Sequence, residues 1–208
     1  MPLAVAHSPA EWTARFGAGG RGTVLTVGSF DGLHRGHQKI LRGVVARARA
    51  MGCIAAAVTF HPHPLKVLRP SEAPPLICTI EQRLAGFEEL GLDAVLVLKF
   101  DLALSRLTPE EFVQSTLLEP LHMRGILVGE NFRFGHRQAG DVRLLGDLGR
   151  KHGFALEIVP PVSLRGEAVS STAVRQAVQG GVVERATRML GRPFALTGEI
   201  RTGTGQGS

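Results

Sequence analysis

The sequence has no tyrosine, one tryptophan and two cysteines among its 208 residues, and aromatic residues make up only 5% of it. Cys53 and Cys78 stand at a spacing that matches no zinc or redox motif, so we expect structural thiols. No stretch approaches the roughly 18 apolar residues of a transmembrane helix, and the start lacks the basic and apolar regions of a signal peptide. These absences predict a soluble, cytoplasmic protein without a membrane partner.

The overall composition fits one folded domain, with 44% hydrophobic and 20% charged residues. The formal net charge of +6 would suit a phosphate-rich partner, either a nucleotide or a nucleic acid. The arginines are scattered, however, and a solvated basic surface on helices explains them equally well. The arginines that we assign to such helix surfaces are Arg42, Arg47, Arg49, Arg83, Arg143, Arg150 and Arg188.

Strand-like and helix-like segments alternate along the chain. Apolar, β-branched runs predict strands at 23–30, 53–60, 93–100, 125–129 and 154–159. Helical spacing and capping residues predict helices from about 36 to a stop at Gly52, at 79–90, from Thr108 onward, and at 141–151. This order predicts an α/β fold with a doubly wound parallel sheet, whose ligands lie beyond the carboxyl ends of the strands.

Two segments lack regular patterning, the proline-rich 61–76 and the polar 131–140. Long loops in a compact α/β domain are often functional, and surface decoration is the alternative. The Gly-rich residues 201–208 are expected to be mobile.

The strongest chemical signal is Gly28-Ser-Phe-Asp-Gly-Leu-His-Arg-Gly-His37, between the first predicted strand and the first helix. Its glycines permit a tight turn close to a ligand, and the free N–H groups of a helix start favour an anion. His34 and His37 could stabilise charge on a phosphoryl group. The alternative is a turn whose histidines only cap the helix. No G-K-[ST] sequence follows, so this is not a P-loop.

The segment resembles the H-x-G-H signature of nucleotidyltransferases and, more narrowly, the G-x-F-D-G-x-H-x-G-H form of prokaryotic bifunctional riboflavin kinase/FMN adenylyltransferases (FAD synthetases). Three further segments match that family in order: Phe60-His-Pro-His-Pro64, Val128-Gly-Glu-Asn-Phe-Arg-Phe-Gly135 and Ser170-Ser-Thr-Ala-Val-Arg175. The resemblance implies a Rossmann-like nucleotidyltransferase domain over 1–190 that transfers AMP from ATP, with Mg²⁺, to FMN, giving FAD and pyrophosphate.

The resemblance also implies roles for the residues of the first and last motifs. His34, His37 and Arg175 would be catalytic. ATP would bind to Gly28, Phe30, Asp31, Gly32, Gly36, Ser171 and Thr172. Taken alone, the segment at 170–175 is a helix start whose hydroxyl groups cap free N–H groups, and both interpretations can hold together.

The two middle motifs are implied to bind FMN. After the second strand these residues are His61, Pro62, His63 and Pro64; after the fourth they are Asn131, Phe132, Arg133 and Phe134. The prolines stiffen the first loop. A histidine metal site there is a weaker alternative, because no carboxylate or cysteine at ligand spacing completes it, and we predict no protein metal site. Both phenylalanines could stack on a flavin or simply belong to the core.

The chain departs from the family near its end. Residues 191–208 resemble only the entry to the family's riboflavin kinase β-barrel, and the kinase's P-T-A-N-containing motif is absent. We therefore do not expect riboflavin phosphorylation. The alternatives are a transferase acting on another phosphate substrate, a nucleic-acid-binding module, and a silent flavin-binding regulator. An oligomer is possible.

Overall fold

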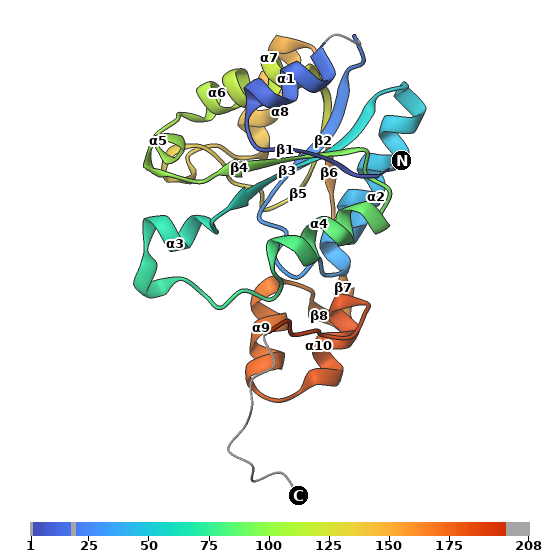
Figure 1. Ribbon diagram of the computed structural model, residues 1–208, viewed down its shortest axis with the longest axis vertical. Coiled ribbons are helices and arrows are strands. Elements are labelled where there is room, and N and C mark those ends of the chain that lie inside the picture. The colour runs from blue at the N-terminus through green and yellow to red at the C-terminus, as the bar shows by residue number, and fades with distance from the viewer. Residues whose placement is uncertain (1, 18–19, 199–208) are drawn as a thin grey trace, which may run out of the picture.

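The computed structural model describes residues 2–17 and 20–198 (Figure 1). The expectations for residues 199–208 lie outside the described residues. Six parallel strands form one sheet in the order β1-β4-β3-β2-β5-β6. They are β1 (Ala4–Ala6), β2 (Thr23–Val27), β3 (Ile54–His61), β4 (Ala94–Lys99), β5 (Met123–Gly129) and β6 (Ala155–Val159), and β7 (Ser163–Leu164) and β8 (Glu167–Ala168) form a separate hairpin.

Helices connect these strands. They are α1 (Pro9–Phe16), α2 (Arg35–Met51), α3 (Pro64–Leu68), α4 (Ile80–Glu89), α5 (Leu102–Ser105), α6 (Pro109–Phe112), α7 (Glu119–Leu121), α8 (Val142–His152), α9 (Ser171–Gln179) and α10 (Val183–Leu190), with the 3₁₀-helices η2 (Pro70–Glu72) and η4 (His136–Gln138) and the π-helix η3 (Val113–Leu118). The predicted α/β class and its five strands and four helices are confirmed, with shifted ends.

Helices cover both faces of the sheet. Successive side chains of a strand point to opposite faces, so each apolar strand offers a packing surface to the helices on either side. Leu25 packs in one core with Trp12 of α1 and Leu145 of α8, whereas the adjacent Val24 packs with Val44 of α2. Figure 1 shows α1, α6, α7 and α8 on one side of the sheet and α2 and α4 on the other. The strands β2 to β5 are therefore buried on both faces, as the continuous apolar runs predicted, whereas the edge strand β6 is mostly exposed.

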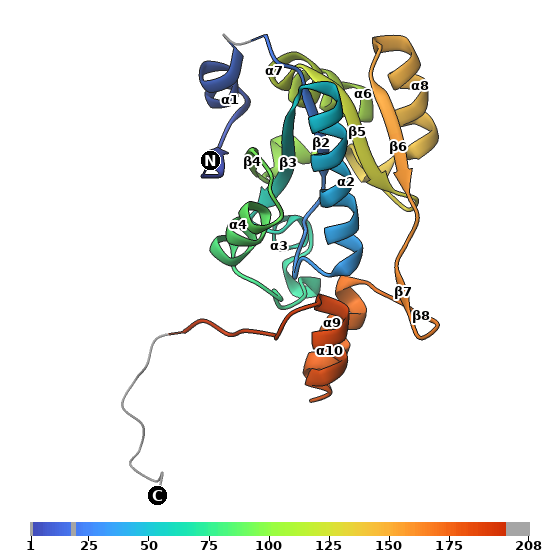
Figure 2. The same ribbon diagram turned by 90° about the vertical axis from the view of Figure 1, so that its right-hand side faces the viewer.

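The strand order reverses direction beside β2. The chain runs from β2 to β3 and β4 on one side, and β5 then pairs with the opposite side of β2. The crevice at such a reversal, beyond the carboxyl ends of the strands, is where doubly wound sheets bind ligands. In Figures 1 and 2 the α9–α10 pair lies beyond the sheet near the start of α2, and the Arg35 side chain at that start donates to the Arg188 carbonyl of α10.

Three details of the prediction are wrong. The first strand ends at Val27 rather than Phe30, because Phe30 has a left-handed φ of 49° that a strand cannot contain. The segment 61–76 is not without regular structure, since it forms α3 and η2. Arg83 does not lie on a solvated surface: it is 2% exposed, on the side of α4 that faces the sheet.

Candidate active site

The four motif segments meet beyond the carboxyl end of the sheet. The turn at 28–37 follows β2, the segment at 61–64 follows β3, the segment at 131–135 follows β5, and α9 starts at Ser171. Two neighbouring cavities lie among them. One has a volume of about 580 Å³ and the other about 960 Å³. Ser29, His63 and Leu65 line both, so the two cavities meet at these residues.

The two histidines of the first motif lie at the start of α2. His34 is its N-cap and is 6% exposed, and its Nδ1 accepts a hydrogen bond of 3.3 Å from the backbone N–H of His37. The rings are stacked, with centroids 3.6 Å apart. A Cβ at Gly36 would lie 3.1 Å from the His34 ring, a tight contact that would require the ring to shift. His34 thus caps α2, whereas His37 lines the smaller cavity.

Both imidazoles are neutral near pH 7. Burial lowers the pKa of His34 to about 4, against a partial opposing effect of its backbone hydrogen bond and of Asp31. Burial, followed by the charges of His34 and Arg83, lowers the pKa of His37 well below its usual value. Since His34 Nδ1 is an acceptor, its proton lies on Nε2. The buried Nδ1 of His37 has no hydrogen-bond partner among the described residues.

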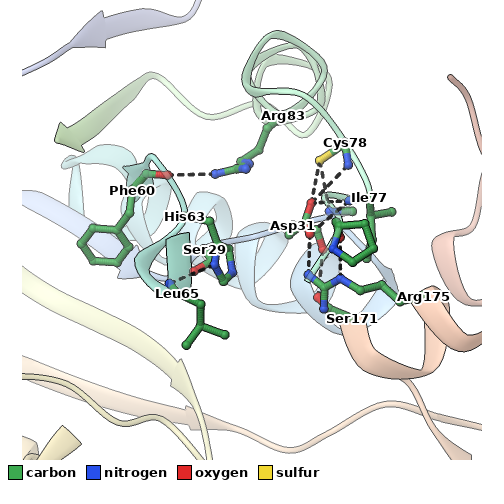
Figure 3. A network of polar contacts seen from close by, with 12 residues as sticks. Ser29, Asp31, Phe60, His63, Leu65, Ile77, Cys78, Arg83, Ser171 and Arg175 are labelled. Carbon is green, nitrogen blue, oxygen red and sulfur yellow. Dashed lines mark hydrogen bonds and ion pairs between the residues drawn. The ribbon is translucent and has the colours of Figure 1, made fainter. Parts of the chain in front are cut away.

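Asp31 joins three separate segments of the chain, as Figure 3 shows. Its carboxylate accepts hydrogen bonds from the backbone N–H groups of Ile77 at 3.0 Å and Cys78 at 3.1 Å, and it pairs with Arg175 Nη2 at 2.5 Å. Its backbone carbonyl accepts a bond of 2.9 Å from Ser171 Oγ. The carboxylate is 2% exposed, so its bonds are made within the protein.

The smaller cavity is lined by the polar residues of the first and last motifs. Phe30, Asp31, His37, Ser171, Thr172 and Arg175 all contribute to it. Arg175 Nε donates to the Pro75 carbonyl at 2.9 Å, and its Nη1 makes no hydrogen bond to the described residues. His34, Gly32 and Gly36 lie behind this lining and shape the turn.

The larger cavity is lined by aromatic residues and by the loop after β5. Phe132 and Phe134 stack with centroids 5.4 Å apart, and both also pack against the main core. Asn131 is exposed at the cavity, and Arg133 forms an ion pair of 3.6 Å with Asp141. The other predicted residues that line it are Gly28, His63 and Pro64.

Five predicted residues lie outside both cavities, namely Gly32, His34, Gly36, His61 and Pro62. His61 is exposed, and neither it nor Pro62, which follows a cis peptide bond, contributes to the lining. His63, in contrast, lines both cavities, and it also caps α3, because its Nδ1 accepts a hydrogen bond of 3.2 Å from Leu65 N–H. Burial is the main cause that lowers the His63 pKa from its usual value.

Sequence reasoning missed several lining residues of the larger cavity. Phe100 and Leu104 follow β4, Phe112 lies in the helix predicted from Thr108 onward, and His136 lies in the polar segment 131–140. The position of Phe100 directly after a buried strand was an available signal, because it places the residue at the same sheet edge.

No group of three or more His, Cys, Asp or Glu side chains gathers at a metal-binding spacing in residues 2–17 and 20–198. None of the helices described there is long and apolar enough to span a membrane.

The sheet order, with the 28–37 turn at the carboxyl end of β2, defines a Rossmann-like domain of the nucleotidyltransferase type. The FAD synthetase family model matches residues 18–173, and the chain belongs to that family.

Two curated relatives match most of this chain. The bifunctional riboflavin kinase/FMN adenylyltransferase of Escherichia coli K12 is 35% identical over 179 residues, which are 86% of this chain and 57% of the relative. The protein of the same description from Pseudomonas fluorescens is 39% identical over 183 residues, covering 88% and 58%. The chain thus spans somewhat more than half the length of these relatives.

A solved structure shares the fold. A crystal structure described as a macrolide-efflux protein from Streptococcus pneumoniae aligns with a TM-score of 0.77 and 25% identity, over 92% of this chain and 62% of that one.

Proposed function

We propose that this chain is an FMN adenylyltransferase that transfers AMP from ATP to FMN, forming FAD and pyrophosphate. The observation that carries the proposal is the pair of cavities that meet at Ser29, His63 and Leu65, one lined by residues of the first and last motifs and the other rich in phenylalanine. Their volumes, about 580 and 960 Å³, suit one nucleotide-sized ligand each. The names of the curated relatives support the same activity.

ATP would occupy the smaller cavity. The N-terminus of α9 supplies free backbone N–H groups, Ser171 and Thr172 add hydroxyl groups, and Arg175 offers the Nη1 group that the protein leaves unbonded. Mg²⁺ would enter with ATP as part of the substrate. In this proposal Asp31 serves ATP indirectly, because its carboxylate is engaged in holding Arg175 and the segment at 77–78.

FMN would occupy the larger cavity, with the isoalloxazine among the phenylalanines and the phosphate toward the junction at Ser29 and His63. Stacking on aromatic faces is the contact that a flavin ring system favours. Asn131 would position the FMN, and we assign it no general-base role.

The reaction is an in-line displacement at phosphorus. An oxygen of the FMN phosphate forms a bond to the α-phosphorus of ATP, and the bond from that phosphorus to the bridging oxygen breaks, with the electron pair leaving on pyrophosphate. The FMN phosphate is already ionised near neutrality, so catalysis rests on positioning and charge stabilisation. Neutral His37, which lines the smaller cavity, can still donate a ring N–H group to a phosphate oxygen that gains charge. His34 lies behind that lining, so its catalytic role would be to hold His37 in place through the stacked ring and the hydrogen bond to His37 N–H.

The domain division belongs to this proposal. Residues 1–190 would form the adenylyltransferase domain, since α10 ends at Leu190 and residues 191–198 contain no helix or strand. Residues 191–208 would begin a kinase-like module or form a tail.

An enzyme that consumes ATP and FMN works where both are available, which would place it in the cytoplasm.

The direct test follows FAD and pyrophosphate by chromatography after incubation of the purified chain with FMN, ATP and Mg²⁺. Riboflavin replaces FMN in the parallel reaction. FAD from FMN, with no FMN formed from riboflavin, is the expected result. Failure to form FAD from FMN would refute the proposed activity.

The H37A variant tests the catalytic turn. Loss of a donor that stabilises transition-state charge lowers kcat by about 10²-fold, so we expect a decrease of that size. An unchanged kcat would remove His37 from the mechanism.

A further inference from the structure

Arg83 is a buried cation directly behind the candidate active site. It comes from α4, is 2% exposed, and its Nη1 donates to Thr59 Oγ1 at 3.1 Å and to the Phe60 carbonyl at 3.3 Å. Its Nε is buried and has no partner among the described residues. Figure 3 shows the side chain between the end of β3 and the segment that carries Cys78.

No carboxylate neutralises Arg83. The ion pairs within residues 2–17 and 20–198 do not include it. The acid of the network in Figure 3 is Asp31, which already pairs with Arg175 and accepts two backbone N–H groups. Asp31 is thus paired with Arg175, and Arg83 adds a buried positive charge that no carboxylate of the described residues pairs with.

A buried charge without a counterion costs free energy, because the protein interior solvates it poorly. The two hydrogen bonds of Arg83 end at a hydroxyl and a carbonyl, both neutral groups. A side chain without charge would avoid this cost. The burial of an uncompensated cation next to two cavities indicates that its counterion arrives with a ligand.

We propose that Arg83 is the built-in counter-charge for the ligand phosphates that occupy the two cavities. It lines neither cavity, so it does not touch the reacting atoms, and its charge acts across the positions of His37 and His63. The charge of Arg83 contributes to the lowered pKa of both histidines. The proposal rests on the function proposed above, because the phosphates that it requires are those of ATP and FMN.

The test compares the affinities of ATP and of inorganic pyrophosphate, each with Mg²⁺, by calorimetric titration. R83M removes the charge, and R83K keeps it. We expect R83M to bind both ligands about tenfold more weakly, as one unit charge in a partly buried site would cause, and R83K to remain within about threefold of the wild type. R83Q repeats the charge removal with a polar side chain, in case R83M does not fold.

Two control variants separate charge from structure. T59V keeps the charge and removes a hydrogen-bond partner of Arg83, together with the 3.3 Å hydrogen bond that Thr59 Oγ1 donates to the Ser29 carbonyl. R47M removes one exposed arginine of α2, about 16 Å along the helix from Gly36. Both are expected to retain wild-type affinity. A cooperative thermal transition of each free variant confirms that it is folded.

The outcomes are distinct. Equal ATP affinity in R83M, R83Q and the wild type would overturn the role of Arg83 and leave the proposed function intact. Equal weakening in R83K, T59V and R83M would also overturn it, because hydrogen bonding rather than charge would be responsible. If the wild type bound neither ATP nor pyrophosphate, both this inference and the proposed function would fall.

Discussion

His34 makes the stability of the fold depend on pH. Its imidazole is 6% exposed, and burial lowers its pKa from 6.5 to about 4. As the pH falls through 6.5, His34 becomes protonated in the unfolded chain but stays neutral in the folded protein. The contribution of His34 to stability is therefore undiminished above neutral pH and is lost as the pH falls from 6.5 towards 4.

The size of this loss follows from the two pKa values. Between about pH 7.5 and about pH 5, a shift from 6.5 to about 4 removes about 2 kcal/mol from the free energy of unfolding. The matched variant is H34N. Asparagine is a favourable N-cap residue, so it can replace the acceptor that Nδ1 provides to His37 N–H, and it does not titrate.

Urea unfolding of the wild type and H34N at both pH values measures the effect. We expect the wild type to lose about 2 kcal/mol more than H34N on acidification. His37 and His63 also have lowered pKa values, but they are present in both proteins and largely cancel in the difference. Equal losses in the two proteins would refute the argument that His34 is buried in its neutral form.

Two substitutions test the segments that frame the cavities. D31N breaks the buried pair with Arg175, so we expect a loss of about 3 kcal/mol in urea unfolding and weaker ATP binding; unchanged stability would contradict the anchoring role. G135A should raise the KM for FMN more than that for ATP, because a Cβ there would lie 2.6 Å from Pro109 N at a φ of +73°. G153A is its control, with a similar φ of +76° and no atom within 4 Å; an equal effect on KM would contradict the expected clash.

The sequence predicted the centre of the fold well because buried parallel strands have a strong local signature. The apolar runs that become β2 to β6 were all found, and the carboxyl-edge rule then placed three of the four motifs at one sheet edge. Strand ends were less predictable. Phe30 continues the apolar run, but its left-handed backbone and its packing on Phe87 are set by the turn rather than by its own preference.

The sequence analysis overlooked β1, α1 and α10. A three-residue strand such as Ala4–Ala6 has no periodicity to detect. The start of α1 did carry a signal, since Ser8 accepts from Glu11 N–H and Pro9 occupies the first helical position. For Arg83 no local signal existed, because a charged residue on a short amphipathic helix is expected to face solvent. The Arg83 side chain faces the sheet because α4 lies against the end of β3, where Thr59 and Phe60 accept its hydrogen bonds.

Asp31 explains why the first and last motifs, separated by more than 130 residues, act on one cavity. A serine and an arginine on one helix turn bond to the same residue: Ser171 to its carbonyl and Arg175 to its carboxylate. That carboxylate also fixes the backbone at 77–78, the entry to α4 and thus to Arg83. One buried acid therefore links the 28–37 turn, the start of α4 and the first turn of α9. The sequence motif does not distinguish Asp31 from its neighbours, whereas the fold makes it the residue that connects the elements around the smaller cavity.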